Sequence, residues 1–204
     1  MSHTIYTSPG IVLSSRASGE ADRTLFLLTR DFGLLRVKAQ SVRKAESKMR
    51  FLTQTFSHGI YDCVMTQGGW RLTGTTQGVQ DTARANSQIP YHDSDFLRIM
   101  KRGADIIKSC VQGEYPNEEL YTHMYQSLFI DPIDTDHPDR INWYTGFELL
   151  MSAKILAVLG YFDKDTYELP TEYSHEALLS LAHDKTLLIK RINEALRATS
   201  LIES

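Results

Sequence analysis

Cysteine is scarce in this sequence, and its scarcity excludes several classes of protein. Among 204 residues there are two cysteines, Cys63 and Cys110, which lie far apart without a partner spacing. They cannot supply a disulfide framework or a four-cysteine zinc site, so reduced thiols in a cytosol fit best. The first ten residues, MSHTIYTSPG, also lack the basic start and apolar stretch of a secretory signal. We therefore expect a cytoplasmic protein.

Long apolar runs and the common catalytic motifs are missing as well. The most apolar stretch, Leu149–Leu159, contains Lys154 and is about half the length that crosses a bilayer, so no membrane span is predicted. No G-x-S-x-G, Walker A or G-x-G-x-x-G pattern occurs. No motif therefore supports a hydrolytic, nucleotide-driven or dinucleotide-dependent activity. We expect a protein that is not an enzyme and has no cofactor.

The acidic loop after residue 130 could be taken for a metal site. Its oxygen and nitrogen ligands would be Asp134, Asp136, His137 and Asp139, but the loop lacks the glycine and the terminal glutamate of an EF-hand. We interpret it as a solvated loop, and no metal is predicted.

Acidic residues are nearly absent from residues 36–50. This segment, RVKAQSVRKAESKMR, has six basic side chains and the single acid Glu46, although the whole chain has a formal net charge of −3. Residues 1–80 contain ten Lys and Arg against five Asp and Glu, whereas residues 81–204 contain twelve against twenty. A basic half is the electrostatic signature of a nucleic-acid or membrane-surface binder. The local excess predicts a polyanion as partner.

Short strands separated by turn residues are predicted for the first 78 residues. We expect them at residues 5–14, 23–29, 34–39, 53–65 and 70–76. Asp31-Phe32-Gly33 is typical of a tight turn, and Gln67-Gly68-Gly69 of a hairpin. Five short strands fit a small closed barrel.

The third of these strands directs its cations to one side. Alternation of period two separates Arg36 and Lys38 from the apolar set Leu35, Val37 and Ala39. An exposed loop then leads to the fourth strand. The candidate nucleic-acid-binding residues are Arg36, Lys38, Arg43, Lys44, Lys48 and Arg50, and the patch could extend to Arg16, Arg23, Arg30 and Arg71. The alternative interpretation is a solvated charged surface.

Aromatic side chains could add base stacking, but strand periodicity favours packing. Trp70 is in phase with its apolar neighbours, which favours the core over stacking, and Tyr61 remains undecided. Phe26 lies in a strand that is apolar on both sides and is expected in the core. Glu20 and Asp22 bracket a turn, so we expect them to make turn hydrogen bonds rather than to form a catalytic carboxylate pair.

From about residue 93 the apolar period becomes helical. We predict helices at residues 94–112, 116–129, 141–159, 174–183 and 184–201. Ser94 is the expected N-cap of the first, and Gly113 and Gly160 are expected to end the first and the third. The third is apolar nearly all round and should be the central buried helix. Residues 79–92, with no period, are the expected join between strands and helices.

The order of features in residues 19–56 resembles the RecO family of recombination mediator and DNA-repair proteins. The features that carry the resemblance are Glu20, Asp22, Thr29, Gly33, Arg43, Lys44, Ser47, Lys48 and Phe56. The resemblance returns in Glu148–Tyr161, which ends in Leu-Gly-Tyr. The chain departs from the family pattern at Gln40, Ser41 and Thr55, where lysine, glycine and proline are usual. It has no cysteine quartet after Leu-Gly-Tyr, so it is similar to the zinc-free members.

The resemblance implies an α+β protein of two domains. Residues 1–80 would form a five-stranded OB-fold β-barrel that binds nucleic acid, and residues 81–204 an all-α helical domain that docks partners. It also implies a cytoplasmic, nucleoid-associated bacterial protein that binds single- and double-stranded DNA, promotes strand annealing, and loads a recombinase with a RecR-type mediator and single-strand-binding protein. The acidic tail of the latter would need a local cation, and the candidates are Lys101, Arg102, Lys154 and Lys190/Arg191.

Two other functions remain open on the sequence. OB barrels bind RNA as readily as DNA, and no residue pattern here reads the 2′-hydroxyl. The barrel could also be a protein–protein adaptor without nucleic-acid binding, with its basic loop docked on an acidic partner.

Overall fold

The fold begins with a long hairpin. β1 (Ile5–Ser18) pairs antiparallel with β2 (Asp22–Thr29), and the chain reverses near Gly19. The computed structural model describes residues 4–77, 93–111, 113–134, 136–163 and 168–200. β1 contains a bulge between Val12 and Ser14, where its register against β2 shifts. Such a bulge bends a strand and so helps a sheet to close on itself.

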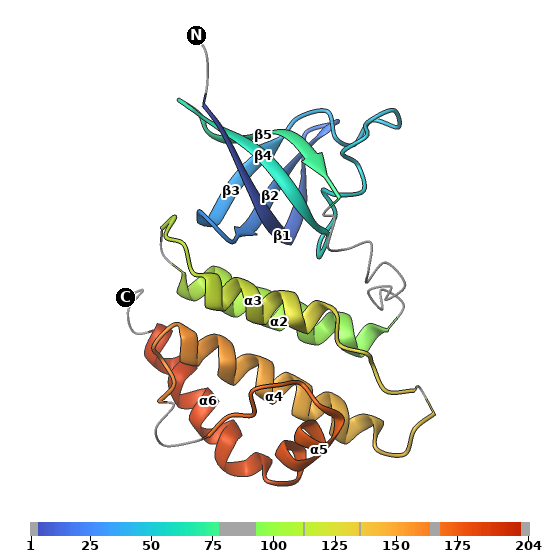
Figure 1. Ribbon diagram of the computed structural model, residues 1–204, viewed down its shortest axis with the longest axis vertical. Helices are drawn as coiled ribbons and strands as arrows, with labels where there is room; N and C mark the ends of the chain where they lie inside the picture. The colour runs from blue at the N-terminus through green and yellow to red at the C-terminus, as the bar shows by residue number, and fades with distance from the viewer. Residues whose placement is uncertain (1–3, 78–92, 112, 135, 164–167, 201–204) are drawn as a thin grey trace. The chain divides into compact units, whose positions relative to one another are not determined.

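Three more strands complete the barrel. β3 (Gly33–Ala39) pairs with β2, β4 (His58–Thr66) pairs with β1 and β5 (Gly69–Thr76), and a short parallel contact joins β5 to β3. The closed order is β1-β2-β3-β5-β4, and Figure 1 shows it in blue to green. Five strands closed in this way form an OB-type barrel. The predicted fold class is confirmed.

Alternating side chains fill the inside of the barrel. Leu35, Val37 and Ala39 of β3 are at most 1% exposed, whereas Arg36 and Lys38 between them are exposed. The separation of the two faces of this strand is therefore as predicted. The rest of the barrel core consists of Val12, Leu25, Leu27, Val42, Tyr61, Cys63, Trp70 and Leu72. Burial of each large apolar side chain contributes about 1.5–3 kcal/mol.

The fourth strand begins at His58 rather than at Thr53, where the sequence predicts it. Residues 40–57 instead form a run of turns, most of them closed by hydrogen bonds between residues three apart. Phe56 ends this run with a φ of 66°, a left-handed conformation that a strand does not contain. The sequence of residues 53–57, TQTFS, has no apolar and polar alternation that would have supported a strand there.

The chain divides into two units. The barrel unit comprises Met1–Ser87 and Gln112–Thr122, and the helical unit comprises Gln88–Val111 and His123–Ser204. Gln112–Thr122, which the sequence assigns to the helical domain, thus belongs with the barrel. The predicted boundary at residue 80 and the whole of the predicted join at residues 79–92 lie outside the described residues. The division into residues 1–80 and 81–204 stays a prediction.

The segment that contains Glu114 and Tyr115 is held against the barrel by two close contacts. The Nε1 atom of Trp70 donates a hydrogen bond to the Glu114 carboxylate at 2.7 Å. Gly33 lies against the backbone of Tyr115, and a Cβ at Gly33 would collide with the carbonyl oxygen of that residue. Gly33 also has a φ of 74°, so both the backbone conformation and the available space require glycine.

The helices have bounds close to those predicted. They are α2 (Ser94–Cys110), α3 (Glu118–Leu128), α4 (Arg140–Val158), α5 (His175–His183) and α6 (Lys185–Ser200). In the helical unit α4 is the central element: it is buried almost throughout Trp143–Ala157 and contacts α2, α5 and α6, as Figure 1 shows. Phe96 of α2 stacks on Phe147 of α4 at a ring-centroid distance of 5.9 Å. The predicted central buried helix is confirmed.

Asp93, and not the predicted Ser94, is the N-cap of α2. Its carboxylate accepts hydrogen bonds from two amides of the first turn and from the hydroxyl of Tyr144 at 2.6 Å, and it pairs with Arg140 at 3.2 Å. Burial raises the pKa of Asp93, but the hydrogen bonds from Tyr144, a backbone amide and Arg140 outweigh it, and the net shift is downward. Asp93 therefore fastens the start of α2 to α4 as an ionised carboxylate.

Candidate nucleic-acid interface

Four strands of the barrel align outward-pointing side chains in one row. The register places Arg16 of β1 opposite Thr24 of β2, Thr24 opposite Lys38 of β3, and Lys38 opposite Arg71 of β5. Directly opposed residues of neighbouring strands point to the same side of a sheet. Arg16, Lys38 and Arg71 are exposed. Because neighbouring strands lie about 4.8 Å apart, the row is roughly 15 Å long.

A second pair extends this row along the strands. Arg36 of β3 lies opposite Phe26 of β2, two residues from Lys38 and Thr24 and on the same side. Arg36 is exposed and Phe26 is half-buried. We call the outer surface formed by these residues the cationic face; its members are Arg16, Thr24, Phe26, Arg36, Lys38 and Arg71.

The expectation that Phe26 lies in the core is wrong. Its neighbours Leu25 and Leu27 fill the inside of the barrel, so alternation turns Phe26 to the outside, next to an arginine. Because consecutive residues of β2 are apolar, the sequence does not show which of its side chains face outward. Thr24, the one polar residue of the same phase in the middle of the strand, is the signal that could have revealed it.

The β3–β4 loop, residues 40–57, carries the other four candidate cations. Those exposed side chains are Arg43, Lys44, Lys48 and Arg50. Val42, which is fully buried, inserts into the core of the barrel, and Met49 packs against the same core. The loop is therefore anchored from within, while its charged side chains remain in solvent.

Hydrogen bonds fasten the first part of the loop to the turn between β1 and β2. The amide of Arg43 donates to the Ala21 carbonyl at 2.9 Å, and its guanidinium donates to the Gly19 carbonyl at 2.7 Å. The Asp22 carboxylate accepts from the amide of Ser41 at 2.8 Å, which is the turn hydrogen bonding expected of this aspartate. The loop thus leaves β3 beside the end of the barrel that contains Arg16.

The second part of the loop is fastened to β1 at its bulge. The amide of Phe56 donates to the Val12 carbonyl at 2.7 Å. Ser15 donates its amide to the Thr55 hydroxyl and its hydroxyl to the Thr53 carbonyl, at 3.2 and 2.6 Å. Thr55, where the resembled family usually has proline, thus supplies an acceptor. The loop is therefore held at both ends by hydrogen bonds to the rest of the barrel unit.

Ion pairing does not neutralise the candidate cations. In the part of the chain that the structure describes, none of Arg36, Lys38, Lys44, Lys48 and Arg50 has a carboxylate partner. A cation without a carboxylate partner gives its full charge to a polyanion that approaches it.

Two of the four residues that could extend the patch do not point to the cationic face. Arg23 lies opposite Ala39, a core residue, and donates to the Ser15 hydroxyl at 2.9 Å. Arg30 is ion-paired with Asp31 at 3.1 Å, and this hydrogen bond raises the pKa of the Arg30 guanidinium. Arg16 and Arg71 lie in the row described above, so the strand register places these two residues on the cationic face.

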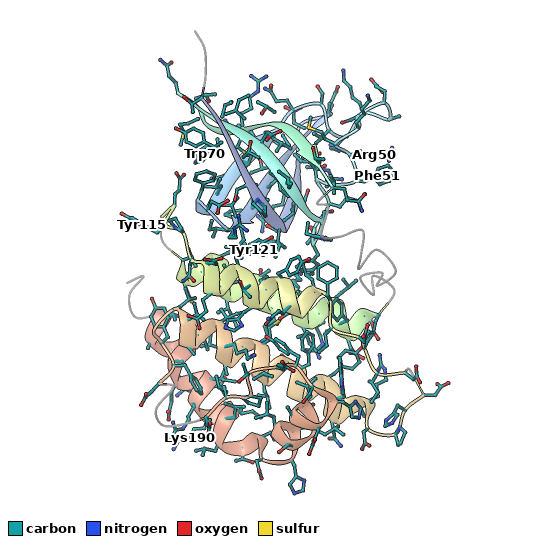
Figure 2. All side chains as sticks on the ribbon, in the orientation of Figure 1. Arg50, Phe51, Trp70, Tyr115, Tyr121 and Lys190 are labelled. Carbon is teal, nitrogen blue, oxygen red and sulfur yellow. The ribbon has the colours of Figure 1, made fainter. Side chains whose placement is uncertain are left out.

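Trp70 and Tyr61 both belong to the core of the barrel. Trp70 is 7% exposed, as strand periodicity favours, and its ring packs edge-on against Tyr6 at 5.2 Å. Tyr61, which the sequence left undecided, is 1% exposed and donates its hydroxyl to the Leu52 carbonyl at 2.8 Å. Neither ring is available for base stacking, whereas Figure 2 shows Phe51 at the margin of the barrel.

Two further findings concern the described residues alone. No group of three or more His, Cys, Asp or Glu side chains among them is arranged to hold a metal ion. None of their helices combines the length and the apolar composition needed to span a bilayer.

A closed five-stranded barrel with exposed cations on β1, β3 and β5 has the architecture of an oligonucleotide-binding module. Residues 1–73 of the chain match the family model described as "Recombination protein O N terminal". A "DNA repair protein RecO" of Desulfitobacterium hafniense (strain DSM 10664 / DCB-2) is 28% identical over 157 residues, which cover 77% of this chain and 52% of that protein.

Shorter and stronger matches fall on the barrel. A "DNA repair protein RecO" of Synechococcus elongatus is 48% identical over 68 residues, 33% of this chain and 24% of that protein. One of Heliobacterium modesticaldum is 48% identical over 54 residues, 26% of this chain and 20% of that protein. This chain spans about half the length of the first of these relatives. The chain is thus similar to RecO proteins, most strongly over the barrel, as the resemblance predicts.

Proposed function

We propose that this chain acts in DNA repair as a non-enzymatic recombination mediator that binds DNA through the cationic face and the β3–β4 loop. One observation carries the proposal: Arg16, Lys38 and Arg71 form a row across four strands without a carboxylate partner among the described residues. The OB-type barrel supports it, because the outer side of strands two and three is where such barrels bind oligonucleotides. The names of the RecO relatives support a repair role.

Strand annealing follows from the same electrostatics. Two complementary strands repel each other through their phosphates, and cations that replace condensed counterions reduce this repulsion while leaving the bases free to pair. The face and the loop together provide eight such side chains, which are Arg16, Arg36, Lys38, Arg43, Lys44, Lys48, Arg50 and Arg71. The chain would bind single strands first and then promote their pairing with a second strand or a duplex.

The helical unit would dock partners in the bacterial cytoplasm, close to the nucleoid. We assign it the acidic tail of single-strand-binding protein, and a RecR-type mediator would assist in loading the recombinase. Lys154 is a poor candidate for the receiving cation, since it is 5% exposed and donates to the Thr171 carbonyl, and burial lowers its pKa. Arg102 is paired with Glu148 at 2.6 Å. Lys101 is exposed without a carboxylate partner among the described residues, and Lys190 is exposed with a long pairing to Glu194 at 4.0 Å, so both fit the role better.

A salt series with labelled single-stranded DNA tests the binding. If four or five cations contact phosphates, the logarithm of the association constant should fall with the logarithm of salt concentration at a slope of roughly −3. Charge reversal of Arg43, Lys44 and Lys48 to Glu should reduce the affinity at low salt and slow the annealing of complementary strands.

A matched control reverses three exposed lysines of the helical unit, Lys101, Lys185 and Lys190, and should change binding little. Folding of both variants is checked by thermal unfolding. Undiminished binding of the loop variant would reject the interface and favour an adaptor without nucleic-acid binding. Competition by RNA of the same sequence, if it exceeds competition by DNA, would instead favour an RNA-binding protein.

A further inference from the structure

Phe51 is the one exposed phenylalanine in the chain. Of the eight phenylalanines, seven are buried or half-buried, whereas the side chain of Phe51 is 74% exposed. A single exposed apolar side chain is common on protein surfaces and needs no explanation in itself. The surroundings of Phe51 are what distinguish it.

The backbone of Phe51 is fixed, so its ring is held in solvent by structure. Its carbonyl accepts hydrogen bonds from the Ser57 hydroxyl at 2.8 Å and from the Gln54 amide at 3.3 Å. The carbonyl of the next residue, Leu52, accepts from the hydroxyl of Tyr61, a core residue. The carbonyl before it, that of Arg50, accepts from the fully buried Thr53 at 3.1 Å. Three consecutive carbonyls are therefore occupied.

Two cations are close to Phe51 in the sequence of the same loop. Arg50 precedes Phe51 directly and Lys48 is three residues away; both are exposed and neither has a carboxylate partner among the described residues. Figure 2 shows Arg50 and Phe51 together at one margin of the barrel, with Trp70 and Tyr115 toward the other side of this view. The loop thus combines an exposed aromatic face with positive charge, which is the chemistry that binds unpaired bases and their phosphates.

We propose that Phe51 is a stacking platform for an unpaired base of single-stranded DNA, with Arg50 and Lys48 contacting the phosphates on either side. The assignment rests on the proposed function and refines it, because it names a residue that distinguishes single strands from duplexes. A base within a duplex has both of its faces covered by neighbours, so an exposed ring gains nothing from it without unstacking. Pre-organisation of the loop reduces the entropy lost when the base binds.

The test compares Phe51→Ala, Phe51→Leu and Phe51→Trp in the full chain. Removal of one stacked ring should weaken binding of oligo-dT by about 5- to 150-fold, the range found for base–aromatic stacking. Phe51→Leu, which is apolar but cannot stack, should behave like Phe51→Ala, and Phe51→Trp should bind at least as tightly as the wild type. The salt slope should stay unchanged in all three, because no charge is lost.

Binding of an abasic oligonucleotide separates the contribution of the bases from that of the phosphates. This oligonucleotide keeps the phosphates, so the wild type and Phe51→Ala should bind it equally. The matched control is Tyr115→Ala, which removes another exposed ring of the barrel unit, one that is 78% exposed, and should leave oligo-dT binding unchanged.

Three outcomes overturn the inference while the proposed function stands: wild-type binding with a steep salt slope that Phe51→Ala does not weaken, an equal loss on abasic DNA, or an equal loss on duplex DNA. If the wild type shows no salt-dependent binding at all, the proposed function fails first.

Discussion

Neutralisation of Lys38 and Arg71 tests the interface at the point where β3 meets β5. These residues are directly opposed in the short parallel pairing that closes the barrel. Both are exposed, without a carboxylate partner in the described part of the chain. Replacement of both by Gln keeps a polar side chain with part of the aliphatic stem and should change stability by less than about 0.5 kcal/mol, as expected for surface positions. The variant therefore alters charge and little else.

The expected loss of affinity follows from counterion release. Each phosphate contact on a single strand contributes about −0.7 to the salt slope, so the double variant should reduce its magnitude by about 1.4. If the contacts contribute nothing near 1 M salt, the loss is about 60-fold at 50 mM and about 10-fold at 200 mM. The assay is fluorescence anisotropy of labelled oligo-dT at four or five salt concentrations, with the wild type measured in parallel.

A control pair removes the same charge elsewhere. Lys101→Gln with Lys190→Gln replaces two exposed lysines of the helical unit. Neither lysine belongs to the cationic face or to the β3–β4 loop, so the slope should stay at the wild-type value if these two elements hold the phosphates. Equal losses in both double variants would mean that net charge alone drives binding. An unchanged slope in the barrel variant would show that the row does not contact phosphates.

Two further predictions concern the folded state. Burial raises the pKa of the Cys63 thiol to about 12, so a thiol reagent at mildly alkaline pH should modify the half-buried Cys110 and reach Cys63 after denaturation; early modification of both would contradict the burial. The pKa of Asp93 lies below its ordinary value, so the stability it contributes is present above that ordinary value and is lost as the pH falls through the lowered one. Asp93→Asn keeps an N-cap acceptor but loses the charge opposite Arg140, so it should destabilise the protein at neutral pH, and the difference from the wild type should shrink as the pH falls through the lowered pKa of Asp93; denaturant unfolding at neutral pH and at a series of acidic pH values measures this difference, and a constant difference would refute the argument.

The division of β3 into two faces could be predicted because it is a property of a single strand. The sequence of β3 alone contains the alternation that buries Val37 and exposes Lys38. The alignment of Lys38 with Arg16 and Arg71 is different in kind: it depends on the register of three strand pairs and on a bulge in β1. Periodicity does not determine register, so Arg71 could be proposed from the sequence but not distinguished from Arg30.

For the β3–β4 loop, the charge could be predicted from the sequence but the structure could not. Its positive charge was evident from the composition, but its shape was not, because hydrogen bonds to distant residues determine it. Ser41 illustrates this: its φ of 56° is unusual for a residue other than glycine, and its amide is held by the carboxylate of Asp22. The resembled family usually has glycine there. Serine can adopt the same left-handed backbone conformation as glycine, but at a higher conformational free energy. The hydrogen bond from the Ser41 amide to the Asp22 carboxylate helps to offset this cost.

A chain with a net charge of −3 can hold a polyanion because screening makes the local arrangement of charge decide the interaction. The excess of acids lies in residues 81–204, and the barrel unit has few carboxylates near its cations to weaken them. Asp31 is paired with Arg30, Glu114 accepts from Trp70, and Asp22 accepts from a backbone amide. Each of these carboxylates is used to stabilise the barrel itself. These three acids thus hold turns and ends of strands, apart from the exposed cations of the row and the loop, and the proposed binding of phosphate rests on this separation.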